Sequence, residues 1–207
     1  KQNLINDLLA NQKITDLSKD WSMNLNVSNY KRCGPMLDIC PTILAGNGGE
    51  VDNNYLEVVN GTRTDYINLI DYIESNDMND DLVQNALENC IDIDSFLTYQ
   101  AFQIFIDNRD WPGNNIKFWR DQRTGGKWRW ILYDTDFGFG IWDANAYLTN
   151  TLAHALEENG PGWPNPPWST LLFRKIISNN HFKDRFIIIF SDLLNTTFKP
   201  ENLTEHL

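Results

Sequence analysis

The segment "IDIDSFLTYQAFQIFID" at residues 91–107 constrains the fold more than any other part of the sequence. Its apolar and aromatic residues do not keep to one face of a helix but surround the helix axis almost completely. A helix of this kind is stable only where neighbours cover it on most sides, so we expect a buried central helix. A chain of 207 residues is long enough to build one domain around such a helix.

Other segments have the ordinary pattern of amphipathic helices, with apolar residues three and four positions apart. They are "NLINDLLANQ" (3–12), "TRTDYINLIDYIESN" (62–76) with Thr64 as its cap, "DDLVQNALENC" (80–90), "STLLFRKIIS" (169–178) and "HFKDRFIIIFSDLLNTTF" (181–198). Residues 13–61 instead show short extended pieces and turn signals. The pattern predicts an α+β protein that is mostly helical, with one short sheet and no internal repeat.

The sheet is predicted from two short segments, "NIKFWR" (115–120) and "KWRWILY" (127–133), which are rich in β-branched and aromatic residues. The glycine-containing connection "DQRTGG" between them favours an antiparallel hairpin. In such a hairpin the start of the first strand lies beside the end of the second, at a strand spacing of about 4.8 Å. We therefore expect Asn115 and Asp134 to lie side by side.

Asp110 lies on the loop between the buried helix and this hairpin, where the Pro112 turn can fold it back toward Asn115 and Asp134. An aspartate can act as a base toward a hydroxyl group, whereas amide and carboxylate oxygens are hard ligands for Mg²⁺ or Mn²⁺. Protein kinases use this set for phosphoryl transfer, with D-x-x-x-x-N spacing before a hairpin and a metal-binding Asp after it. Asp110 and Asn115 have that spacing.

Together with "IDIDSFLTYQ", the segments "NRDWPGNNIKFWR" and "GKWRWILYDTDFGFG" resemble the spore-coat protein H (CotH) kinase family, the atypical bacterial protein kinases. The similarity runs from about Tyr55 through "WSTLLFRKII" to "DLLNTTF". It implies an atypical protein-kinase-like fold, C-lobe-like in this chain, with ATP-dependent transfer to Ser or Thr of a protein substrate and a divalent metal. We accordingly expect a partial N-terminal region at 1–54 and a CotH-like kinase C-lobe at 55–207, in one domain overall.

The resemblance also implies a role for each polar residue of the hairpin. Asp110 matches the catalytic Asp, Asn115 matches the metal-binding Asn, and Asp134 matches the Asp of the D-F-G position. The literal "DFG" at 136–138 lies two residues later, because "DTDFGFG" is similar to the D-x-x-x-G-F-G run of secreted casein kinases. Asp136 is then a second acidic neighbour, which either shares the metal, Mg²⁺ or Mn²⁺, or caps the turn.

The sequence departs from the family upstream of the hairpin. No glycine-bearing segment that would cover ATP is recognisable, and we assign no phosphate-binding lysine. Three explanations remain open: a truncated nucleotide lobe, residues omitted from the chain, or poor nucleotide binding. Because the chain begins at Lys1 rather than Met, we expect a processed or trimmed product.

Two other functions fit the same residues. The first is a kinase-like module of a secreted or cell-surface bacterial protein that binds without catalysis. The resemblance implies the same secreted or cell-surface bacterial location for an active enzyme. The second is a glycoside hydrolase that pairs Asp110 with Asp134 or Asp136. A calcium loop of the EF-hand type fails, because Phe139 occupies the position that requires glycine.

Charge and composition narrow the partners further. The formal net charge is −11 without an offsetting stripe of Lys and Arg, so we expect no nucleic acid, and an anionic nucleotide would need metal ions to bind. The apolar run "FIIIF" at 186–190 is far too short to span a membrane. The cysteines lack the CxxC spacing of a zinc site, which leaves only a Cys33–Cys40 bridge open.

Overall fold

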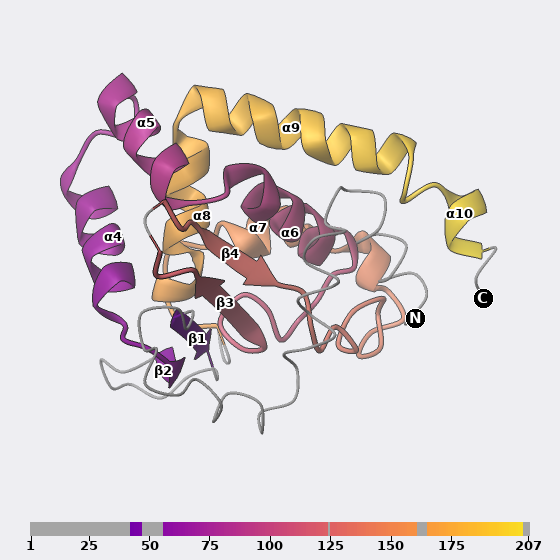
Figure 1. Cartoon of the computed structure of the whole chain (residues 1–207). Helices are drawn as coiled ribbons and strands as arrows, with labels where there is room; N and C mark the ends of the chain where they lie inside the picture. The colour runs from indigo at the N-terminus through magenta and orange to yellow at the C-terminus, as the bar shows by residue number, and fades with distance from the viewer. Residues whose placement is uncertain (1–41, 47–55, 124, 161–164, 205–207) are drawn as a thin grey trace.

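The computed structural model describes residues 42–46, 56–123, 125–160 and 165–204, which form a small sheet with helices beside and above it (Figure 1). The elements are β1 (Thr42–Gly46), β2 (Leu56–Asn60), α4 (Thr64–Ser75), α5 (Asp81–Cys90), α6 (Ile93–Phe105), β3 (Ile116–Arg120), β4 (Trp128–Ile131), a 3-10 turn (Ala146–Leu148), α7 (Thr151–Ala155), α8 (Trp168–Ser178), α9 (Asn180–Asn195) and α10 (Pro200–Thr204). The predicted α+β class, mostly helical with a short antiparallel sheet, is confirmed.

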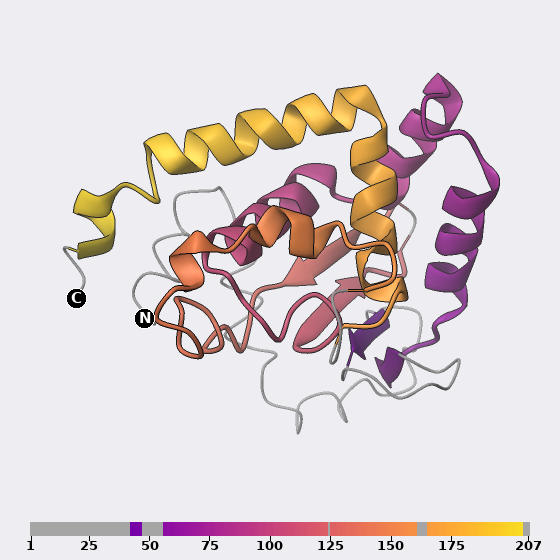
Figure 2. The same cartoon turned by 180° about the vertical axis from the view of Figure 1, so that it is seen from behind.

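Helix α6 is the buried central helix that the sequence predicts. Nine of its 13 residues are buried, including the polar side chains of Gln100 and Gln103, and the one exposed residue is Asp94 in the first turn. It packs against β4, α7 and α9, and the long α9 crosses the molecule above α6 and α8 (Figures 1 and 2). The Phe96 ring meets the Trp130 ring edge-on at 4.5 Å. This packing fixes where the loop that leaves α6 begins.

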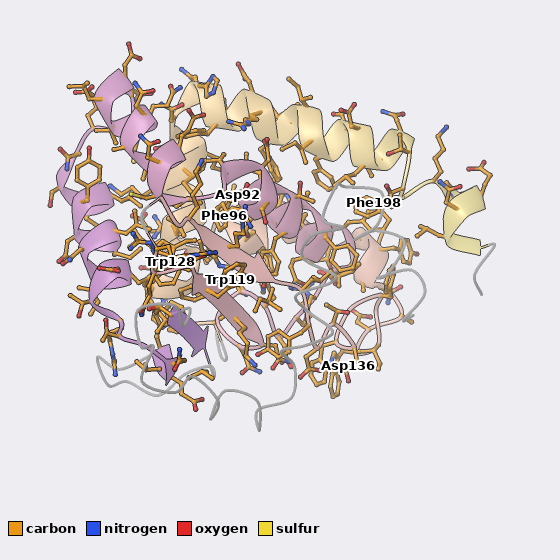
Figure 3. All side chains as sticks on the ribbon, viewed as in Figure 1. Asp92, Phe96, Trp119, Trp128, Asp136 and Phe198 are labelled. Atoms are coloured by element: carbon orange, nitrogen blue, oxygen red, sulfur yellow. The ribbon has the colours of Figure 1, made fainter. Side chains whose placement is uncertain are left out.

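Asp92 anchors the first turn of α6 to the sheet. Its carboxylate accepts the Ser95 N–H at 3.3 Å as an N-cap, and accepts Nε of Arg129 on β4 at 2.9 Å. In Figure 3, Asp92 and Phe96 lie toward the Trp128 end of β4, whereas Asp136 lies beyond the opposite end of that strand. The first turn of α6 therefore lies beside the start of β4, and the chain that leaves α6 runs toward the other end.

The sheet has the strand order β2-β1-β3-β4, and all its pairs are antiparallel. The predicted hairpin is confirmed, with Lys117 opposite Ile131 and Arg120 opposite Trp128. Strand β1 pairs with β3 on one side and with β2 on the other, in the stretch 13–61 for which the sequence predicts only short extended pieces and turns. The side chains of β3 and β4 alternate between a buried face, which contains Trp128 and Trp130, and a half-buried face.

The predicted helices at 62–76, 80–90, 169–178 and 181–198 correspond to α4, α5, α8 and α9 within a few residues. Thr64 is the first residue of α4 rather than its cap, because Arg63 already has helical dihedral angles and its carbonyl accepts the Ile67 N–H. The predicted helix at 3–12 and the Cys33–Cys40 pair lie outside the described residues. Among the helices described, none is long and apolar enough to cross a membrane.

Candidate active site

Asp110 lies on the loop between α6 and β3, and a buried asparagine fixes its backbone. The Asn108 side chain is inaccessible to solvent; its Nδ2 donates to Gln103 Oε1 at 2.9 Å, and its Oδ1 accepts the Asp110 N–H at 3.1 Å. The Asp110 carbonyl in turn accepts the Asn114 N–H at 3.0 Å. The half-buried Asp110 side chain thus projects from a backbone that is tied to the end of α6.

The D-x-x-x-x-N spacing brings two predicted site residues into direct contact. Asn115 Nδ2 donates to Asp110 Oδ2 at 3.0 Å. Asn115 comes directly before β3, and Asp134 lies three residues after the last paired residue of β4, Ile131. The hairpin therefore brings the segments that carry Asn115 and Asp134 to the same end of the sheet, as the strand pattern predicts.

Backbone strain is concentrated around these residues. Among the described residues, the non-glycine positions with positive φ are Asp107 (50°), Asn115 (49°), Asp134 (48°) and Phe139 (54°). Asn and Asp tolerate this left-handed region better than most side chains, and such strain often accumulates at functional sites. All four positions lie in the loop after α6 or in the segment after β4, which are the two segments that carry the predicted site.

The charge of Asp136 affects the pKa of both Asp110 and Asp134 at this end of the sheet. Asp134 is exposed, and partial desolvation of its carboxyl is the largest cause that raises its pKa; a hydrogen bond with Asp136, the charge of Asp136 and the charge of Asp110 raise it further. Burial also raises the pKa of Asp110, which a hydrogen bond with Asn114 lowers and the charge of Asp136 raises. Such a cluster of like charges favours the binding of protons or of a cation.

The "DTDFGFG" segment (134–140) is docked against the end of α6 and the loop that carries Asp110. The Phe139 N–H donates to the Ile106 carbonyl at 2.5 Å, and the Arg109 N–H donates to the Phe137 carbonyl at 3.3 Å. Between these two contacts, Gly138 is buried against Ile106. The docking explains why Asp136 lies close enough to Asp110 to affect its pKa.

Replacing Gly138 with alanine is expected to destabilise this docked segment. The added Cβ would lie 3.0 Å from both the carbonyl oxygen and Cδ1 of Ile106. Overpacking of this kind costs about 1–3 kcal/mol, so the melting temperature of Gly138→Ala should fall in a thermal unfolding experiment. The Ile106→Val change removes Cδ1, so in the Gly138→Ala background it should restore part of the lost stability. Unchanged stability in Gly138→Ala would show that the close approach is absent.

A network that sequence spacing does not reveal supports the same loop. The buried carboxylate of Asp107 accepts Thr151 Oγ1 at 2.7 Å and Arg109 Nε at 3.1 Å. Arg109 Nη1 lies 3.3 Å from His154 Nδ1, and His154 Nε2 lies 3.0 Å from the Trp111 carbonyl. Burial is the main cause that lowers the pKa of His154. His154 looks isolated in the sequence, yet it supports the Asp110 loop from α7.

The oxygen donors at this site fit a hard divalent cation. Mg²⁺ is usually bound by one or two carboxylates together with water and substrate phosphates, and Asp134, Asp136 and the Asn115 amide oxygen could supply the protein ligands. Within the described part of the chain, no group of three or more His, Cys, Asp or Glu side chains is arranged to hold a metal ion. The site would therefore need further oxygen ligands from water or from a bound phosphate.

An exposed apolar segment follows directly after the acidic cluster. More than half of the large hydrophobic side chains that are exposed in the described residues belong to it: Phe139, Ile141, Trp142, Tyr147, Leu148 and Leu152. A cavity of about 480 Å³ lies between residues 104–107 at the end of α6 and parts of the segment 139–151. Exposed apolar residues in such numbers are typical of a surface that contacts another molecule.

A family model described as CotH kinase protein matches residues 40–207 of this chain. The matched span contains all the described residues, and with them Asp110, Asn115, Asp134 and Asp136. Neither the curated proteins nor the solved structures contain a match to the chain.

Proposed function

The chain belongs to the CotH kinase family, and from this premise we propose that it is a metal-dependent phosphotransferase that moves the γ-phosphate of ATP to serine or threonine of a protein. One observation carries the proposal: Asn115 contacts Asp110 at 3.0 Å in the D-x-x-x-x-N spacing, and Asp134 and Asp136 lie close enough to raise carboxylate pKa values in the same cluster. A base toward a hydroxyl and ligands for a cation are thus neighbours.

In the proposed reaction, the acceptor hydroxyl oxygen attacks the γ-phosphorus and the bond to the β–γ bridging oxygen breaks, so that ADP leaves. Asp110 accepts the hydroxyl proton, and its raised pKa makes it a stronger base than an ordinary aspartate. Asn115, Asp134 and Asp136 would hold Mg²⁺ or Mn²⁺. The cation, when bound, neutralises charge on the phosphates.

Electrostatics support a requirement for metal. The site carries three neighbouring carboxylates in a chain of formal net charge −11, so a bare triphosphate would be repelled. A divalent cation between the carboxylates and the phosphates removes this repulsion. The exposed apolar segment at 139–152 supports a macromolecular acceptor, because a small substrate would need no such surface. A secreted or cell-surface location is part of the same proposal.

The proposal is tested by nucleotide binding and phosphate transfer with the whole chain. We expect ATP with Mn²⁺ or Mg²⁺ to raise the melting temperature, because a ligand that binds only the folded state stabilises it, and ATP with EDTA to give little change. Radiolabelled ATP should then transfer its γ-phosphate to the chain itself or to dephosphorylated casein. Absence of a thermal shift with ATP and Mn²⁺ would contradict the proposal and favour a module that binds without catalysis.

A further inference from the structure

Asn165, a buried residue on the loop before α8, bridges two points of the loop that carries Asp110. Its side chain is 2% exposed. Its Oδ1 accepts the Gly113 N–H at 2.7 Å, and its Nδ2 donates to the Arg109 carbonyl at 3.3 Å. A single side-chain amide therefore spans residues 109–113, and Asp110 lies between its two contacts.

These bonds satisfy backbone groups that regular secondary structure does not. Residues 109–113 lie outside helices and strands, and the Gly113 N–H is buried. A buried backbone donor without a partner costs free energy comparable to a lost hydrogen bond. Asn108 holds the Asp110 N–H from the α6 side, and Asn165 holds Arg109 and Gly113 from the α8 side. The loop 109–113 is thus held by hydrogen bonds from two segments that are distant in the sequence, the end of α6 and the segment before α8.

We infer that Asn165 is a positioning residue for Asp110. It acts through the backbone at Arg109 and Gly113, so the direction of the Asp110 carboxylate depends on how the segment before α8 packs. This inference rests on the proposed function for the role of Asp110 as the base. The two hydrogen bonds from Asn165 to Gly113 and Arg109, which we call the Asn165 clamp, are a property of the fold. Sequence patterns did not reveal it, because 52 residues separate Gly113 from Asn165.

The side-chain chemistry makes the inference specific to asparagine. An amide both accepts and donates, and this position uses both functions. Aspartate has nearly the same shape but, when ionised, can only accept; it would place an oxygen against the Arg109 carbonyl. Asn165→Asp therefore tests the donor without removing volume, and Asn165→Ala removes both contacts.

Asn179 provides a matched control. It is also an almost fully buried asparagine, 4% exposed, that uses both ends of its amide on backbone groups. Its Nδ2 donates to the Met78 carbonyl at 2.5 Å, and its Oδ1 accepts the Phe182 N–H at 3.1 Å at the start of α9. It makes no contact with residues 109–113, so Asn179→Ala should reduce stability through the same chemistry without moving Asp110.

The kinetic test compares these variants with ATP, Mg²⁺ and an acceptor that the wild-type chain phosphorylates. A small displacement of a catalytic group can reduce a rate by up to about 100-fold, so we expect a large fall in kcat for Asn165→Ala and Asn165→Asp. The KM for ATP should stay within about twofold, because binding groups are untouched. Asn179→Ala should keep the wild-type kcat per folded molecule. Equal kcat values in Asn165→Ala and Asn179→Ala would overturn the inference.

A second readout does not depend on activity. Loss of one hydrogen bond should speed amide hydrogen exchange at Gly113 about tenfold in Asn165→Ala, whereas Asn179→Ala should speed exchange at Phe182 and leave Gly113 protected. If the wild-type chain transfers no phosphate, the proposed function fails. The exchange experiment still shows whether Asn165 holds the Gly113 N–H. Unchanged protection of Gly113 would overturn the Asn165 clamp. If Asn165→Ala does not fold, Asn165→Asp replaces it in the kinetic comparison, where a wild-type kcat would overturn the inference, because this variant loses the bond to the Arg109 carbonyl and keeps an acceptor for the Gly113 N–H.

Discussion

Asp110→Asn is expected to lower the proposed phosphate transfer by about 10²–10⁴-fold, the usual contribution of a general base, and to leave the proposed binding of ATP and Mg²⁺ intact. The amide has the shape of the carboxylate, and its oxygen can still accept Nδ2 of Asn115, so the loop geometry is preserved. In the proposed reaction, the variant loses the group that takes the proton of the attacking hydroxyl. The expected signature is a large fall in kcat with little change in the KM for ATP, measured by initial rates of γ-phosphate transfer.

A control variant separates this role from a general effect of charge. Asp143 is an exposed carboxylate on the segment that follows "DTDFGFG", where it accepts the Asn145 N–H at 2.8 Å. Asp143→Asn also removes one negative charge near the site, but it should leave kcat within about twofold of wild type, as an exposed charge away from the reacting atoms does. Retention of near-wild-type kcat in Asp110→Asn would show that Asp110 is not the base.

Asp134→Asn is expected to abolish metal-dependent transfer and, at neutral pH without metal, to raise the melting temperature. Loss of a charged group that stabilises the transition state costs about 10²–10³-fold in rate. The gain in stability has a separate cause. Asp134 is exposed, but partial desolvation and then the neighbouring Asp136 and Asp110 raise its pKa in the folded protein, so ionisation of this carboxyl opposes folding. A neutral amide removes that penalty.

The pH dependence gives this prediction a definite sign. Because the pKa of Asp134 is raised in the folded protein, its protonated carboxyl favours folding. This contribution to the free energy of unfolding is fully present below the unfolded pKa of about 3.9 and is lost as the pH rises through the folded pKa. The melting temperatures of Asp134→Asn and wild type should therefore converge toward pH 4 and separate toward pH 7. Millimolar Mg²⁺ should raise the melting temperature of the wild type at pH 7 and have little effect on the variant.

Asp121, in the connection between β3 and β4, provides a control of opposite sign. A hydrogen bond with Arg123 is the main cause that lowers the pKa of Asp121, so its ionised form favours folding. Asp121→Asn should therefore lower the melting temperature at pH 7, and the difference should disappear as the pH falls through the folded pKa.

A wild type that is more stable than Asp134→Asn at pH 7 without metal would contradict the proposed carboxylate cluster.

Several features of the site could be predicted because they depend on short stretches of chain. Helix α6 follows from apolar residues all around the helix axis, and β3 and β4 follow from two β-rich segments joined by a glycine-containing connection. The contact between Asp110 and Asn115 follows from their spacing, since only one loop separates them. In each case the relevant interactions lie within the element or between neighbours in the chain.

The bounds and partners of strand β1 could not be predicted in the same way. Its five residues, Thr42–Gly46, lie in a stretch of short extended pieces and turn signals. A short strand is stabilised by the partners on both its sides, here β2 and β3, and β3 begins 70 residues after Gly46. Local propensity for β-structure is weak compared with this pairing, so the pattern of the segment alone carries little information.

The sequence by itself determined the buried central helix, the hairpin and the polar residues at the end of the hairpin opposite its turn, because hydrophobic periodicity and turn chemistry act over a few residues. Only the tertiary structure decided how that end is held. His154 and Thr151 reach the Asp110 loop from α7, and Asn165 reaches it from the segment before α8. These side chains meet the loop because helices pack on the sheet, and contacts of this kind have no fixed spacing along the chain.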